Sequence, residues 1–179
     1  MPKQVFKQHS DVGLPVEAHF GEGIPKALGP FYKTAAGVVV PSHRPETGET
    51  IGYRVYTKSG TSTHTRLHEL QHAYYGAPDR SDKIIGRAKM LYRHAEDELL
   101  AEMGAMQGMG RAVTYKTLLH QPYLRLRSDD ASDKEILQVL TQLAEVYEIP
   151  LPRELVLELQ ERTKGIKGKP LMRFLRGEY

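Results

Sequence analysis

The chain has 179 residues, of which 40% are hydrophobic and 26% charged, with a net charge of +3. These values are typical of a soluble globular protein with a sizeable core. The absence of cysteine excludes disulfides, thiol chemistry and cysteine-ligated zinc. No apolar run is long enough to span a membrane, and the N-terminus lacks the apolar region of a signal peptide. We therefore expect a soluble protein, either cytoplasmic or delivered by a secretion or phage system.

The N-terminal third is predicted to be mostly extended. Glycine and proline residues interrupt residues 1–33, which allows short strands or turns and little helix. Two isolated histidines, His9 and His19, lie here, and we expect both at the surface. Residues 36–58 predict a β-hairpin, because two segments rich in β-branched and aromatic residues flank a polar connection at 41–50.

The stretch after the hairpin is predicted to form one short helix. Threonine and serine at 61–63 offer an N-cap, and Gly76 and Pro78 offer a stop downstream. The apolar positions that such a helix needs in order to pack on a core are Leu67, Leu70 and Ala73.

This helix carries the pattern H-E-x-x-H at residues 68–72. Residues four apart lie on the same helix face, so His68 and His72 can both direct a ring nitrogen at one metal ion. Glu69 is rotated by about 100° from His68, and from there it can reach a water on the ion without being a ligand. Zinc suits this set, because neutral imidazoles are good ligands and a catalytic site keeps one position open. His64 shares this face, but three successive histidines cannot easily converge on one ion, so we expect His64 at the rim.

The segment resembles the active-site helix of the zincin metallopeptidases, whose signature is H-E-x-x-H. The resemblance implies that His68 and His72 are zinc ligands and that Glu69 is the general base. The metzincin extension, with a third histidine soon after, is absent, so the third ligand must come from elsewhere. A strand directly before the helix fits the zincin layout, in which an edge strand binds an extended substrate. An ordinary structural hairpin fits the sequence equally well.

Residues 81–109 are predicted to form a second helix, capped by Ser81 or Asp82. Continuing its apolar stripe places Glu98 and Glu102 on the inward face, whereas Asp97 points outward. Two carboxylates on an apolar face are costly unless they are paired or bound to a metal. The stripe itself consists of Ile84, Ala88, Leu91, Ala95, Ala105 and Met109.

The run from Glu98 to Glu102 resembles the glutamate helix of the gluzincins. In that family a ligand glutamate is followed four residues later by a carboxylate that hydrogen-bonds a ligand histidine. The family more often has aspartate there, so Glu102 departs from the pattern. ImmA/IrrE-type peptidases have comparable helices, and the resemblance covers residues 61–109. It implies Glu98 as the third ligand, while Glu102 in an exchanged role and His94 in an all-histidine site, as in SprT-type proteases, remain alternatives.

The C-terminal part is predicted to be helical. Residues 115–127 are ambiguous because Pro122 interrupts them, and they contain three candidate oxyanion donors, Tyr115, His120 and Tyr123. A capping box at 132–135 opens an amphipathic helix to about residue 148. Pro152 suits the first turn of another helix that ends near Gly165. We expect a catalytic domain at 1–127 and a helical extension at 128–179 packed on it.

The residues and the resemblance together predict an α+β fold with a zincin-like metallopeptidase core and a C-terminal helical hairpin. The core would contain a small sheet, the H-E-x-x-H helix and the glutamate helix. We expect one zinc ion per chain, held by His68, His72 and Glu98. The expected activity is hydrolysis of peptide bonds in a peptide or protein substrate, with Glu69 moving the proton. A phage-associated protein or the toxin domain of an effector would suit such a chain.

Two other functions remain open at the level of sequence. The same metal site could cleave a peptidoglycan amide, although no feature of the sequence indicates recognition of a sugar or a D-amino acid. The chain could instead be a non-enzymatic helical binding protein whose basic C-terminus contacts nucleic acid or a partner. The basic residues that crowd this end are Arg162, Lys164, Lys167, Lys169, Arg173 and Arg176.

Overall fold

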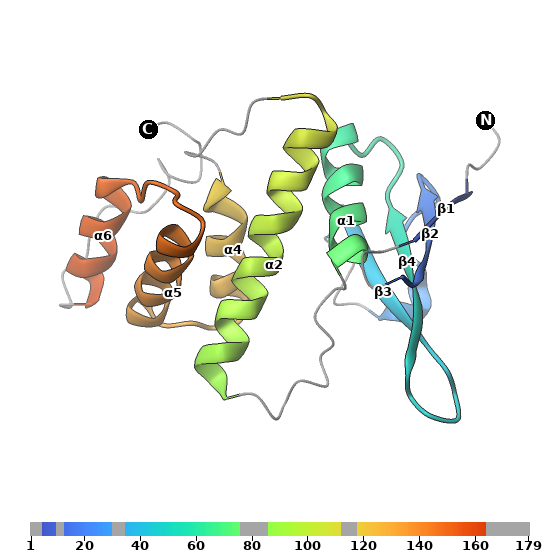
Figure 1. The fold of residues 1–179 in the computed structure, drawn as a ribbon, viewed down its shortest axis with the longest axis horizontal. Helices are drawn as coiled ribbons and strands as arrows, with labels where there is room; N and C mark the ends of the chain where they lie inside the picture. Colours follow the sequence, from blue (N-terminus) through green and yellow to red (C-terminus); the bar gives the residue numbers. More distant parts are fainter. Residues whose placement is uncertain (1–4, 10–12, 30–34, 76–85, 112–117, 164–179) are drawn as a thin grey trace. The chain divides into compact units, whose positions relative to one another are not determined.

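The computed structural model has an α+β architecture and describes residues 5–9, 13–29, 35–75, 86–111 and 118–163 (Figure 1). The described residues form two compact units, Met1–Asp79 with Leu100–Ala112 and Arg80–Leu99 with Val113–Tyr179. The boundary between the units falls inside one continuous helix, α2. The strands are β1 (Val5–His9), β2 (Pro15–Phe20), β3 (Gly37–His43) and β4 (Thr50–Thr57), and the helices are α1 (Thr63–Tyr75), α2 (Arg87–Gly108), α4 (His120–Ser128), α5 (Asp133–Val146) and α6 (Arg153–Thr163).

The first unit contains a four-stranded sheet in the order β1-β2-β4-β3. Strands β3 and β4 pair antiparallel from Gly37 opposite Thr57 to His43 opposite Thr50, which confirms the predicted hairpin. Strand β2 pairs with β4 in parallel and with β1 antiparallel, so the N-terminal segment supplies two further strands. His19 on β2 was expected at the surface, and this expectation is wrong. Its side chain is only 18% exposed, and its ring stacks on Tyr56.

Helix α1 packs against one face of this sheet (Figure 1). Its Ala73 is fully buried and Leu70 is partly buried, and both belong to the same apolar cluster as the sheet. Period-two alternation along the strands supplies the other side of the cluster. Its buried sheet residues are Val16, Ala18, Tyr53 and Val55. Leu70 and Ala73 therefore hold α1 on the sheet, while His68 and His72 lie on another face of the helix.

Glycines on the last turns of α2 allow a close approach to α1. A Cβ atom at Gly104 would collide with the side chain of Gln71, and one at Gly108 would lie 3.3 Å from Leu67 Cδ1. Gly110 then takes the left-handed conformation with φ of 65°, typical of the residue just past a helix. The glycines thus allow α2 to pack closely on α1 and mark the end of α2.

The second unit is helical, and α5 packs against α4 and α6. Ser132 and Glu135 form the predicted capping box at the start of α5, with each side chain bonded to the other's backbone N–H. Pro122 does not break a helix, contrary to expectation: it lies in the first turn of α4, where a missing N–H leaves no intrahelical bond unmade. The core of this unit includes Leu91, Leu99, Leu118, Leu119, Leu126, Ile136, Leu140, Leu143, Leu155 and Leu159.

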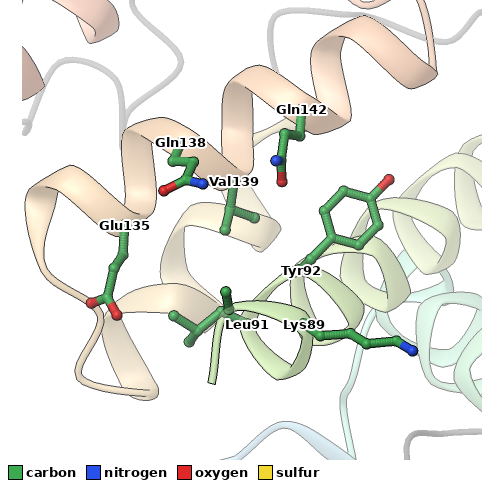
Figure 2. Close-up of a pocket in the computed structure, with 8 residues that line it drawn as sticks. Lys89, Leu91, Tyr92, Glu135, Gln138, Val139 and Gln142 are labelled. Carbon is green, nitrogen blue, oxygen red and sulfur yellow. The ribbon is translucent and has the colours of Figure 1, made fainter. Parts of the chain in front are cut away.

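A pocket of about 280 Å³ lies in the second unit between the start of α2 and α5 (Figure 2). Figure 2 shows Gln138 and Gln142 projecting from one helix toward Tyr92 and Leu91 on the other. Only Glu135 and Lys89 among its lining residues carry charge, and none is a histidine. The pocket is therefore distinct from the predicted metal site in its chemistry.

Burial along α2 follows the predicted stripe with exceptions. Glu102 is 6% exposed, as predicted for an inward carboxylate, whereas Ala88 is exposed. Asp97 is partly buried rather than fully outward, because the helix packs over more than one narrow stripe. Several positions used in the sequence analysis lie outside the described residues, namely Gly76, Pro78, Ser81, Asp82, Ile84, Tyr115, Gly165 and the basic residues from Lys164 onward. None of the described helices has both the length and the apolar character needed to cross a membrane.

Candidate metal centre

Helix α1 brings two histidine rings to one point. Ser62 directly precedes the helix and caps it as predicted, because its Oγ accepts a hydrogen bond from the Thr65 N–H at 3.1 Å. His68 and His72 follow one turn apart, and each is only 8% exposed. Their Nε2 atoms lie 3.1 Å apart, with the rings nearly perpendicular at an interplanar angle of 86°.

This spacing fits a shared zinc ion. Two imidazole nitrogens at zinc–nitrogen distances near 2.05 Å in a tetrahedral site would be about 3.3 Å apart. The Nε2 atoms of His68 and His72 are within a few tenths of an ångström of that separation. Two buried ring nitrogens that converge in this way are suited to binding one cation between them.

Glu98 completes a group that could hold a metal ion. One ligand atom from each of His68, His72 and Glu98 lies within 4.8 Å of the others. Glu98 lies on α2 one helical turn before Glu102, and α2 is continuous between these two residues. Glu102 contacts His68 of α1 within the first unit. Two imidazoles and a carboxylate form a ligand set that zinc uses at catalytic sites.

Glu102 lies behind His68, on the side away from His72. Its Oε2 lies 3.3 Å from His68 Nδ1, and its Oε1 lies 3.1 Å from His64 Nε2. Burial opposes ionisation of this carboxyl, but its interactions with His68 and with His64 outweigh that effect and hold the pKa of Glu102 below its usual value. Glu102 is therefore an ionised acceptor that can orient a histidine ring, which is the role of an outer partner at a metal site.

Glu69 lies against the beginning of strand β3. A Cβ atom at Gly37 would lie 2.5 Å from Glu69 Cγ, so only glycine leaves room for this side chain. Glu69 itself is partly buried and follows His68 directly on α1. The structure thus places Glu69, the predicted base, beside Gly37. Gly37 is the first residue of β3, the last strand in the order of the described sheet.

The rival ligand His94 belongs to a different cluster in the second unit. Its Nδ1 lies 2.8 Å from Asp129 Oδ2 and 3.3 Å from Arg125 Nη2. Arg125 also approaches Glu98, with Nη1 3.8 Å from Oε1. Burial opposes ionisation of Asp129, but the hydrogen bond from His94 and the charge of Arg125 hold its pKa below the usual value. The candidate oxyanion donor Tyr123 accepts a hydrogen bond from Arg127 in the same unit.

Two contacts of the site were not predicted from the sequence. The contact between His64 and Glu102 depends on the reach of a long carboxylate side chain, although the spacing of His64 four residues before His68 was a signal for it. The contact between Gly37 and Glu69 joins positions far apart in the chain, and only an isolated glycine in a β-branched segment indicated a close approach. Both contacts concern the orientation of residues that the motif had already identified.

Searches with the chain find no matching family model, no matching curated protein and no matching solved structure. The zincin resemblance therefore stays a prediction from the motif, and the geometry of His68, His72, Glu98 and Glu69 is what supports a function.

Proposed function

We propose that this protein is a zinc-dependent metallopeptidase of the gluzincin type. The observation that carries the proposal is the convergence of His68 and His72 on α1, whose Nε2 atoms lie 3.1 Å apart, with Glu69 next to the first of them. Glu98 is the carboxylate that could complete this group. These are the residues that the H-E-x-x-H pattern and the glutamate helix would supply. No cysteine competes for the metal, so the histidines and the carboxylate define the site.

Each residue of the site would have a distinct role. The two histidines and Glu98 would hold zinc, which when bound supplies a Lewis acid that activates water and polarises a carbonyl. Glu69 would take a proton from the attacking water and deliver it to the leaving amine nitrogen. Its carboxylate is held against Gly37, which limits the positions it can adopt. A fixed base close to the ligand set is what proton transfer of this kind requires.

The position of β3 favours an extended peptide as substrate. The strand pairs with β4 on one side and stands last in the order of the described sheet. Such an edge can bind an extended chain through backbone hydrogen bonds. Because β3 starts at Gly37 beside Glu69, a peptide added to this edge would run close to the base.

The proposal is tested by separating metal binding from chemistry. Glu69→Gln is nearly isosteric, so the variant should keep one zinc per chain and its fold but lose hydrolysis by about 10²-fold or more. Zinc content would be measured by atomic absorption, and cleavage with an unbiased peptide library. Glu49→Gln is the matched control, because Glu49 lies on the exposed hairpin with its side chain 62% exposed.

The outcomes distinguish the alternatives. Purified peptidoglycan assayed in parallel separates a peptidase from an amidase of the cell wall, since both would need Glu69. A non-enzymatic binding protein would contain no zinc, and its partner binding would be unaffected by Glu69→Gln. Full turnover by the Gln variant, in a preparation free of contaminating peptidase, would remove Glu69 from the mechanism.

A further inference from the structure

One buried carboxylate joins two histidines of α1. Glu102 is 6% exposed, and its two oxygens lie near two different rings: Oε1 is 3.1 Å from His64 Nε2 and Oε2 is 3.3 Å from His68 Nδ1. The two histidines are one helical turn apart on the same face. A carboxylate oxygen only accepts, so His64 Nε2–H donates to Oε1, while His68 Nδ1 lies in close polar contact with Oε2.

A carboxylate oxygen next to Nδ1 favours the tautomer of His68 that carries its proton on that atom. When Nδ1 of a neutral imidazole carries the proton, Nε2 has the free lone pair that a metal ion needs. That Nε2 is the atom directed toward His72. The carboxylate of Glu102 therefore prepares His68 as a ligand, provided that the carboxylate itself is held in place.

His64 can hold the carboxylate of Glu102 in place. A glutamate side chain has three rotatable bonds, and ordering such a chain for one contact is entropically costly. His64 contacts the second oxygen, so the carboxylate is fixed at both ends. His64 itself is not arranged as a metal ligand: its ring lies face to face with that of His68 at a centroid distance of 6.4 Å, and its Nε2 is directed at Glu102.

We propose that His64 is a positioning residue of the metal centre, which acts through Glu102 to hold His68 in its metal-binding tautomer and orientation. The inference rests on the proposed metal site. It also accounts for glutamate at position 102, since its carboxylate contacts two successive histidines of the helix.

Zinc affinity gives the first test. Competition with a chromophoric chelator would measure the zinc dissociation constant of the unaltered chain and of His64→Ala, His64→Gln and His43→Ala. His64→Ala should bind zinc about tenfold more weakly, at the low end of the loss expected when an outer partner is removed. His64→Gln keeps an N–H donor and should recover most of the affinity. His43→Ala, on the exposed end of β3, is the matched control and should bind like the unaltered chain.

A double-variant cycle tests whether His64 acts through Glu102. If it does, His64→Ala should have little further effect on zinc affinity once Glu102→Ala is present, so the two losses should not add. Fully additive losses would overturn the proposal. Complete loss of zinc in His64→Ala would overturn it as well, because His64 would then be a ligand.

The tautomer of His68 can be read without any metal. Long-range ¹⁵N–¹H spectra of the metal-free chain should show His68 with its proton on Nδ1, and His64→Ala should shift it toward a mixture of tautomers. An unchanged His68 signal together with unchanged zinc affinity in His64→Ala would overturn the role of His64 and leave the metallopeptidase proposal standing. Failure of the unaltered chain to bind zinc would instead overturn the metal centre itself, and the spectra would still report on His64 and Glu102.

Discussion

Helices α1 and α5 have nearly the same length but are stabilised in different ways. The buried residues of α5 are Ile136, Val139, Leu140, Leu143 and Ala144, a continuous apolar stripe at helical spacing. The buried residues of α1 are His68, His72 and Ala73, so two of these three carry polar side chains. Both helices have a serine N-cap, yet only α5 has the full capping box.

The contrast predicts which helix a bound metal ion would stabilise. An apolar stripe gains free energy from burial alone, at about 25 cal/mol per Å². Buried imidazoles gain nothing comparable unless their polar atoms are satisfied. Helix α1 is therefore the element that we expect a metal ion to stabilise, and α5 the one that should be indifferent to it.

Removal of a histidine ligand should have the largest effect on this contrast. His72→Ala leaves two protein ligands, short of the three expected at a catalytic zinc site, so the variant should lose its zinc and its hydrolytic activity. The unaltered chain should gain up to about 4 kcal/mol in unfolding free energy at a thousandfold excess of zinc over the dissociation constant. His72→Ala should lose this gain, as measured by melting with and without zinc. One tightly bound zinc in the variant would contradict the ligand assignment.

The third ligand is tested by neighbouring residues on α2. Glu98→Ala should weaken zinc binding severely, whereas Glu102→Ala should weaken it about 10–100-fold as the loss of an outer partner. Asp97→Ala is the control, because it removes an adjacent carboxylate that does not belong to the ligand group. Zinc content and chelator competition would be measured for all three, with His94→Ala alongside. If Glu98→Ala bound zinc normally and His94→Ala did not, the all-histidine alternative would replace the present assignment.

The sequence predicted α5 and the β3–β4 hairpin because their signals are local. A capping box and a 3.6-residue stripe need no knowledge of the rest of the chain, and neither does strand alternation around a polar turn. The parallel pairing of β2 with β4 was not predicted, because it joins residues such as Val16 and Tyr53 that are far apart in sequence. The helix at Pro122 was missed because proline was read as a breaker before the start of the helix was known.

The same distinction holds for the candidate site. The pattern at residues 68–72 and the inward direction of Glu98 and Glu102 follow from helical periodicity alone. The second contact of Glu102, to His64, and the packing of Glu69 on Gly37 depend on side-chain reach and tertiary approach. Sequence reasoning therefore predicted which chemical groups form the site, and the structure adds the contacts that these groups make.

A cavity in α5 tests the other half of this comparison, the expectation that α5 is indifferent to the metal ion. Leu140 is fully buried, so Leu140→Ala should lower the unfolding free energy of the second unit by about 2–5 kcal/mol. Zinc affinity under native conditions should stay within about twofold of the unaltered chain, the uncertainty expected for distant sites that act independently. Urea unfolding and chelator competition would be compared on the same preparation. A large loss of zinc affinity would show that α5 supports the metal centre after all.

The smallest effect concerns the capping box of α5 and its dependence on pH. Hydrogen bonds from Arg87 and then from the Ser132 backbone lower the pKa of Glu135 from its ordinary value of 4.5 to about 2. A carboxyl whose pKa is depressed in the folded state contributes stability above its unfolded pKa, and loses that contribution as pH falls through the folded pKa. The stabilisation by Glu135 should therefore be complete above about pH 5 and should fade between pH 4.5 and pH 2.

Glu135→Gln isolates this contribution from the titration of other carboxyls. The unaltered chain should be more stable than the variant at neutral pH, and the difference should shrink steadily as pH falls below 4.5. Urea is the suitable denaturant because it does not screen charge, and Glu145→Gln, on the exposed side of the same helix, is the control. Zinc content should be the same in all three proteins, since the contacts of Glu135 are to Arg87 and Ser132 and not to the ligand group. A stability difference that stayed constant down to pH 2, or that grew, would contradict the charge-dependent role of Glu135 and leave α5 held by its apolar stripe alone.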